Sequence, residues 1–254
     1  MVVVGAGWIG AETATSARLL GCQVTVVQRA DLPLAGVLPS EAALHTLPWY
    51  REAGVELRTG VAVTGFEADG VRLASGEHLK ADVVVAGVGA RPATDWLRGS
   101  GLALGADLSV ETDDHLAASR PGVWAVGACA SFPSARRLLV HHWDHAMRGA
   151  AVLAANILGG DRAFDPVPYF WSDQFGRRVQ YAGRHEGADS LIWQGDPASD
   201  QWAACWLRDG SLAALVTVDR PRDMLQVRRL IESGTPVDLD RLGDPAVPLK
   251  STTL

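Results

Sequence analysis

The first 28 residues pass from an apolar run to a helical pattern and back to an apolar run. Val2, Val3 and Val4 form a short run that suits a buried strand. Residues 11–21 follow as a helix-like segment, and residues 23–28, QVTVVQ, are again strand-like. A strand, a helix and a second strand in this order predict a βαβ unit with parallel strands.

Three glycines occupy the turn of that unit. Gly5, Gly7 and Gly10 form the pattern G-x-G-x-x-G. In this pattern the first glycine permits the tight turn, the second lets the backbone approach a pyrophosphate, and the third lets helix and strand pack closely. Free N–H groups at the start of the helix favour an anion. A glycine turn without a ligand is the alternative, but the flanking strand and helix supply the context that the motif requires. We therefore expect a dinucleotide site here.

The pattern downstream changes twice. Up to residue 86 a helix-like segment, SEAALHTLPWYREAG, is followed by several short strands, which predicts a three-layer nucleotide-binding domain with an inserted β-meander. Pro48 lies inside that helical segment, so we expect the helix to break there. Residues 141–160 form a long helical stretch. After residue 166 the chain is rich in tryptophan and strand-like, and a further helix is expected over residues 222–234.

Composition limits the partners. The formal net charge of -6 and a pI of about 5.6, without a basic run, exclude the electrostatic pattern of nucleic-acid or anionic-membrane binding. The longest apolar run, residues 81–90, is too short to span a bilayer. No basic region with a small-residue cleavage site opens the chain. We expect a cytoplasmic globular protein.

Cysteine and histidine spacing gives no metal or disulfide site. Cys22, Cys129 and Cys205 are widely separated and form no C-x-x-C motif, which favours buried thiols. His141 and His145 share a helix face at i, i+4 spacing, as zinc ligands sometimes do. The sequence has no H-E-x-x-H motif, so we expect no metal.

Five motifs occur in an order that resembles one family. They are GAGWIGAE, GVGARPAT, VWAVGACASF, HHWDHAMRGAAVLAANILGG and VPYFWSDQFG. This series resembles the FAD-dependent, pyridine-nucleotide-linked ferredoxin reductases that supply electrons to oxygenases. In that family a first glycine fingerprint, for FAD, precedes the part that resembles this chain. The resemblance therefore implies that the sequence corresponds to the later part of such a reductase.

The resemblance implies a fold, cofactors and a partner. The fold is α/β, with a Rossmann-like NAD(P)H-binding domain at residues 1–86, the C-terminal half of an FAD-binding domain at residues 87–165 and a C-terminal α+β domain at residues 166–254. The cofactors are NAD(P)H and FAD, and the partner is a ferredoxin-like iron–sulfur protein. Because the cofactors carry the redox chemistry, we expect no catalytic side chain. We also expect self-association through an exposed face unless a separate N-terminal half chain covers it.

Particular residues follow from the same resemblance. The resemblance places Glu12, which is expected in the first turn of the first helix, near the nicotinamide cofactor. The alternative is that the Glu12 carboxylate only stabilises the positive end of the helix dipole. The loop with Gly87, Gly89 and Arg91 resembles one that crosses under the NAD site, and a strand-ending turn is equally compatible with these glycines.

The FAD half departs from the family pattern at position 128. Gly127 and Ala128 stand where the family has Gly-Asp, and its aspartate holds the ribityl region of FAD. Ala128 has no side-chain acceptor, so any FAD would depend there on backbone N–H groups. Trp143 and Trp171 resemble residues next to the flavin, although tryptophans of this kind also serve as core packing.

The end of the second strand bears on the choice of nucleotide. A carboxylate at this position accepts hydrogen bonds from the ribose hydroxyls of NADH, whereas a nearby arginine accommodates the 2′-phosphate of NADPH. This chain has Gln28 and Arg29. We therefore expect the chain to use NADPH or both nucleotides. Two alternatives stay open: Arg29 is simply solvated, or Asp31 serves as the carboxylate that binds the ribose.

Two other function classes remain. One is an NAD(P)H-binding module without flavin, from a degenerate or split chain. The other is a disulfide reductase, which the absence of C-x-x-C disfavours.

Overall fold

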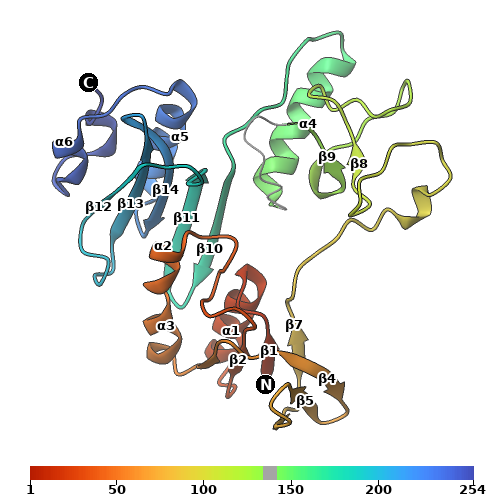
Figure 1. The fold of residues 1–254 in the computed structure, drawn as a ribbon, viewed down its shortest axis with the longest axis vertical. Coiled ribbons are helices and arrows are strands. Elements are labelled where there is room, and N and C mark those ends of the chain that lie inside the picture. Colours follow the sequence, from red (N-terminus) through yellow and green to blue (C-terminus); the bar gives the residue numbers. More distant parts are fainter. Residues whose placement is uncertain (134–141) are drawn as a thin grey trace.

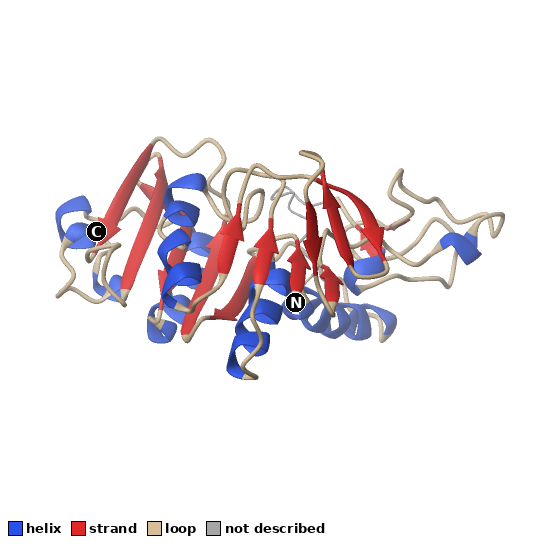
Figure 2. Cartoon of the chain, turned by 90° about the horizontal axis from the view of Figure 1, so that it is seen from below, coloured by secondary structure: helices blue, strands red, loops and turns tan. Residues whose placement is uncertain are grey.

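The computed structural model describes residues 1–133 and 142–254. They form an N-terminal parallel sheet with its helix, a middle segment with few strands, and a C-terminal antiparallel sheet with its helices (Figure 1). Figure 2 shows strands running through most of the molecule with helices packed against them. Among the described residues, no helix is both long and apolar enough to cross a membrane.

The N-terminal sheet is parallel, with the strand order β3-β2-β1-β7. Its strands are β1 (Val2–Val4), β2 (Thr25–Val27), β3 (Glu56–Arg58) and β7 (Val84–Ala86). Helix α1 (Trp8–Leu19) connects β1 to β2 and completes the predicted βαβ unit. In register, Val3 of β1 lies between Val26 and Val85.

The alternation of side chains along β1 builds three layers. Val3 faces α1 and packs with its alanines in one core cluster. Val2 and Val4 face the opposite side, where Val71 and Leu73 cover them. Those two residues belong to the predicted meander, which consists of β4 (Val63–Glu67), β5 (Gly70–Leu73) and β6 (His78–Lys80).

The helical segment after β2 is divided, as predicted from Pro48. It forms α2 (Ser40–Leu44) and α3 (Leu47–Glu52), and Pro48 lies in the first turn of α3. A proline is tolerated in the first turn because its missing N–H has no intrahelical partner there. The break therefore falls just before the proline.

The middle segment contains little regular structure. Its elements are η1 (Asp95–Leu97), β8 (Val110–Glu111), η2 (Gly127–Cys129), β9 (Ala130–Ser131) and α4 (Trp143–Ile157). Strands β8 and β9 pair with each other in parallel, and isolated bridges such as Thr112 with Ala118 join other parts of the described segment. Helix α4 confirms the predicted helix, and it leaves Met147, Ile157 and Leu158 largely exposed.

The C-terminal sheet is antiparallel, with the strand order β10-β11-β14-β13-β12. Its strands are β10 (Tyr169–Gln174), β11 (Arg177–Gly183), β12 (Ser190–Gln194), β13 (Trp202–Arg208) and β14 (Ser211–Val218). Three helical elements follow: α5 (Pro221–Ser233), α6 (Leu239–Gly243) and η3 (Leu249–Ser251).

Both faces of this sheet are covered. On one face Met224, Val227 and Ile231 of α5 join the buried Cys205 in one core cluster, and burial raises the pKa of the Cys205 thiol to about 12. On the other face the segment from Leu34 to Trp49 packs against Trp202. The C-terminal sheet is thus attached directly to the N-terminal part of the chain. All three cysteines are free thiols.

A buried ion pair joins the middle segment to the C-terminal part. The Arg228 guanidinium on α5 donates to both oxygens of Asp144 on α4, with Nη1–Oδ1 at 3.3 Å and Nη2–Oδ2 at 3.0 Å. The Nε of Arg148 lies 3.4 Å from Asp144 Oδ2. Asp144 and Arg228 are both buried, so removing one partner leaves a charge without compensation in a site that water hardly reaches.

We predict that Asp144→Asn lowers the free energy of unfolding by about 3 kcal/mol, because Arg228 then stays buried and unpaired. Urea unfolding followed by tryptophan fluorescence measures this change. The control is Asp95→Asn, which removes an exposed carboxylate and should change stability by less than about 0.5 kcal/mol. Equal stability of the two variants would contradict the assigned role of the buried pair.

Candidate functional site

Two of the three fingerprint glycines are required by packing. Gly5 has a φ of +99°, and a Cβ atom on it would overlap the carbonyl oxygen of Gly87. A Cβ atom on Gly10 would overlap the carbonyl oxygen of Gly5. Helix α1 therefore approaches β1 at a distance that only glycine allows, as predicted for these two positions.

Gly7 differs from both. Its backbone has an ordinary extended conformation, with φ -77° and ψ -167°. Apart from its chain neighbours, no heavy atom of the described residues lies within 4 Å of the place where its Cβ would be. Neither strain nor packing in the protein requires glycine here. Gly7 is the N-cap residue of α1, and no side chain caps the helix. The N–H groups of the first turn therefore lack a side-chain acceptor, which a pyrophosphate would supply.

The end of β2 lies beside this loop. The Gly5 N–H donates to the carbonyl of Val27 at 2.7 Å. The Ala6 N–H donates to Gln28 Oε1 at 3.0 Å, and Gln28 Nε2 donates to the carbonyl of Leu32 at 3.4 Å. Gln28 thus bridges the glycine loop and the chain after β2. Arg29 is exposed.

The loop after β7 is only partly next to the glycine loop. The Gly87 N–H donates to the carbonyl of Val4 at 2.8 Å, and the carbonyl of Gly87 lies against Gly5. Gly89 is exposed with a φ of +124°. Arg91 lies 4.0 Å from Asp95, and its side chain is 78% exposed. Of the three residues predicted in this loop, Gly87 has direct contact with the glycine fingerprint through Gly5.

Glu12 lies one turn further along α1 than predicted. The first turn of α1 has no acidic residue, because the helix begins at Trp8 and Glu12 is its fifth residue. Its carboxylate accepts hydrogen bonds from Ser172 Oγ at 2.6 Å and from the Asp173 N–H at 3.3 Å. Glu12 therefore connects α1 to β10 instead of facing the helix dipole.

An aromatic cluster lies next to this connection. Trp143 at the start of α4 and Trp171 on β10 meet edge to face, with ring centroids 4.8 Å apart. His142 packs edge-on against Trp171 at 4.4 Å. Trp143 is 55% exposed, which distinguishes it from the core residues Trp202 and Trp206. The structure brings together the two tryptophans that the resemblance singled out.

Burial governs the charge of His142. Desolvation holds the pKa of His142 below its ordinary value, and a backbone hydrogen bond to Trp171 and the carboxylates of Asp144 and Glu12 oppose this effect. The imidazole is therefore neutral at neutral pH. His145 stacks on Phe132, with ring centroids 4.9 Å apart. His141, the other half of the i, i+4 pair considered for zinc, lies outside the described residues.

The turn at Gly127 and Ala128, which the resemblance places at FAD, has no side-chain hydrogen-bond acceptor at position 128. Gly127 has a φ of +80°, and its Cβ position lies 3.2 Å from Ala146 on α4. Ala128 is exposed and offers only a methyl group. The turn packs against the start of α4, and the side chain at position 128 offers no hydrogen-bond acceptor.

Two family models match the chain. Residues 1–150 match the pyridine nucleotide-disulphide oxidoreductase model, and residues 169–253 match the reductase C-terminal model. The chain belongs to the pyridine nucleotide-disulphide oxidoreductase family. This result confirms the resemblance and the predicted α/β fold with an added C-terminal domain.

Relatives of known activity cover nearly the whole chain. The 5,5'-dehydrodivanillate O-demethylase ferredoxin reductase subunit of a Sphingobium species is 36% identical over 99% of this chain and 63% of its own length. Putidaredoxin reductase of Pseudomonas putida is 33% identical over 98% of this chain and 61% of its own length. The crystal structure of a covalent putidaredoxin reductase–putidaredoxin complex matches with a TM-score of 0.90 at 32% identity, over 98% of this chain and 62% of the matched chain. This oxidoreductase chain thus spans somewhat over half the length of these relatives.

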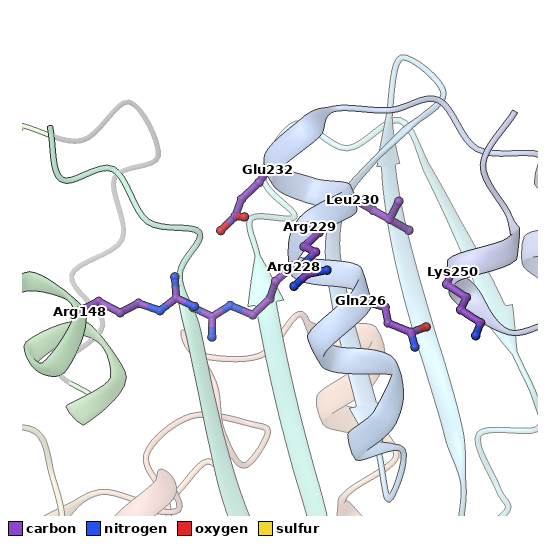
Figure 3. A pocket seen from close by; sticks show the side chains of 7 residues that line it. All are labelled: Arg148, Gln226, Arg228, Arg229, Leu230, Glu232 and Lys250. Atoms are coloured by element: carbon purple, nitrogen blue, oxygen red, sulfur yellow. The ribbon is translucent and has the colours of Figure 1, made fainter. Parts of the chain in front are cut away.

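One feature of the oxidoreductase was missed in the sequence. A cleft of about 650 Å³ lies between α4 and the C-terminal part (Figure 3). Figure 3 shows Arg148 of α4 and Arg228 of α5 extending toward one another. The lining residues are Arg148, Gln226, Arg228, Arg229, Leu230, Glu232 and Lys250. Four of these seven carry a positive charge, and one carries a negative charge. In the sequence, the adjacent Arg228 and Arg229 are the one local sign of this basic cleft.

We predict that Gly7→Val abolishes binding of NADPH and NADH while the fold is retained, because its side chain would fill the open space at the helix N-terminus. Calorimetric titration measures binding, and circular dichroism checks the fold. Gly10→Ala is the matched comparison: its Cβ would overlap Gly5, so this variant should lose stability. Unchanged heats for Gly7→Val would contradict the site.

Proposed function

We propose that this chain supplies the NAD(P)H site and the acceptor-docking face of an FAD-dependent NAD(P)H:ferredoxin oxidoreductase. The observation that carries the proposal is Gly7, whose glycine is needed by no contact within the protein but is suited to a bound pyrophosphate. We assign NAD(P)H binding to residues 1–86, the second half of the FAD domain to residues 87–165 and the reductase C-terminal domain to residues 166–254.

The nicotinamide end is proposed to lie near the aromatic cluster. Glu12 is five residues beyond Gly7 on α1, roughly 7–8 Å along the helix axis. Its hydrogen bond to Ser172 connects that point of the helix to the strand that carries Trp171. The rings of Trp143, Trp171 and His142 form an aromatic surface there, on which Trp143 is still 55% exposed and can contact a flat ring. FAD, when bound, supplies the redox chemistry that links a two-electron hydride donor to a one-electron acceptor.

We propose that the basic cleft docks an acidic iron–sulfur protein. The chain carries a net charge of -6, and four cations line this cleft. Arg148 and Arg228 contact Asp144, so Arg229 and Lys250 supply its exposed positive charge. Such a patch steers an acidic partner and sets its orientation. The relative from Sphingobium is named as a ferredoxin reductase subunit, and the matched crystal structure holds putidaredoxin reductase with putidaredoxin. These two relatives support a ferredoxin-like iron–sulfur protein as the partner.

The alternative is an NAD(P)H-binding module without flavin. Ala128 favours this alternative, since its methyl group cannot accept the hydrogen bond that the family obtains from aspartate. The exposed apolar residues of α4 leave a surface for a further segment or a second copy of the chain, which is the self-association expected above. The two alternatives differ in flavin retention.

We predict that the purified chain holds FAD in less than stoichiometric amount and that Ala128→Asp tightens FAD binding about tenfold to a hundredfold, the effect of one charge-assisted hydrogen bond. Absorbance between about 350 and 500 nm measures retained flavin. NAD(P)H-dependent reduction of a [2Fe–2S] ferredoxin with added FAD should rise with it. Ala198→Asp, at another exposed alanine, is the control. Stoichiometric FAD in the unmodified chain, unaffected by Ala128→Asp, would contradict the assignment of position 128.

We predict that Arg229→Glu and Lys250→Glu each weaken binding of an acidic [2Fe–2S] ferredoxin about tenfold at low ionic strength, and that the loss shrinks as salt rises. Both residues line the cleft and are exposed, so their replacement should not disturb the core. Arg222→Glu, exposed on the same helix outside the cleft lining, is the control for net charge. An equal loss with Arg222→Glu would show that overall charge, and not the cleft, determines binding.

A further inference from the structure

We infer that the nucleotide site prefers NADPH to NADH, and that Arg29 binds the phosphate on the 2′ oxygen of the adenosine ribose. This inference rests on the proposed function, because it needs a nicotinamide dinucleotide on the glycine loop. The chemical difference between the two nucleotides is a dianionic phosphate at one ribose position. The charges at the end of β2 therefore decide between them.

Position 28 carries no negative charge and is held in place. The amide oxygen of Gln28 accepts the Ala6 N–H, and its amide nitrogen donates to the carbonyl of Leu32. A carboxylate here would still accept the Ala6 N–H, but its second oxygen would face the Leu32 carbonyl without a proton between them. The loop after β2 is thus built for an amide. An amide does not repel the 2′-phosphate as a glutamate would.

Arg29 is the cation that remains available at this edge of the sheet. Arg58, at the end of the neighbouring strand β3, is engaged with Glu56 at 2.7 Å and with Glu77 at 2.8 Å. Arg29 is exposed and has no hydrogen bond or ion pair within the described residues. It directly follows Gln28, whose side chain touches the glycine loop. A guanidinium is suited to phosphate because its N–H groups form paired, charge-assisted hydrogen bonds.

Asp31 is the one carboxylate on this loop, and it opposes Arg29. It is exposed, and its Oδ1 lies 3.3 Å from the Cβ position of Gly60. With Arg29 positive and Asp31 negative, the two charges of the loop cancel, so this loop lacks the net negative charge that disfavours a 2′-phosphate. Asp31 reduces the preference without reversing it. Because Arg29 is in solvent, the preference should also weaken with salt.

The test uses binding and needs no turnover. Dissociation constants of NADPH, NADH, adenosine 2′,5′-bisphosphate and AMP are measured by calorimetry with the intact chain. We expect each 2′-phosphorylated ligand to bind about tenfold more tightly than its partner at low salt. Arg29→Ala should bring the two dissociation constants of each pair close together, because it weakens binding of the 2′-phosphorylated ligand and leaves binding of its partner unchanged. Asp31→Asn should increase the ratio, and Gln28→Glu should invert it.

Arg51→Ala, at an exposed arginine on α3, is the control and should leave the ratio unchanged. Equal or tighter binding of NADH by the unmodified chain would overturn the inference and leave the proposed function standing. A ratio that survives Arg29→Ala would overturn the role of Arg29. Failure of all four ligands to bind would instead refute the nucleotide site on which the proposed function depends.

Discussion

The close approach of α1 to β1 is the constraint on which the candidate site depends. At Gly10 the helix touches the carbonyl of Gly5, and at Gly5 the loop touches the carbonyl of Gly87, so a single methyl group at either position would push the elements apart. This packing determines the position of the first turn of α1 relative to β1. Gly7 then faces open space with uncapped N–H groups behind it. The ends of β2 and β7 meet the same loop through Val27, Gln28 and Gly87, so one tight contact aligns the whole edge.

The C-terminal part is positioned by contacts with the same helix. Glu12 binds Ser172, and Thr15 Oγ1 accepts the Phe175 N–H at 3.0 Å. Both contacts join residues about 160 positions apart, and both place β10 beside α1. The C-terminal part also contacts the middle segment, because Arg228 on α5 forms a buried ion pair with Asp144 on α4. Trp143 and Trp171 therefore meet because two separate attachments bring their elements together.

Local patterns in the sequence predicted the local structure. The glycine spacing predicted the βαβ unit, and Pro48 predicted the divided helix, because both effects act within a few residues. Long-range contacts left no such signal. The amide bridge of Gln28, the link from Glu12 to Ser172 and the assembly of Arg148 with Arg228 and Lys250 each join distant parts of the chain. Residues 87–133 contain one short strand pair, β8–β9, and two 3₁₀ turns.

We propose that a dinucleotide binds on the uncapped N-terminus of α1. Hydrogen–deuterium exchange of the backbone amides with and without NADPH tests it most directly, because it reports where on the chain the nucleotide lies. We expect slower exchange at residues 6–12 and 28–32, with no change in the meander strands at residues 63–80 or in the C-terminal sheet strands β12–β14. Protection confined to the basic cleft or the C-terminal sheet, with unchanged exchange at residues 6–12, would contradict it.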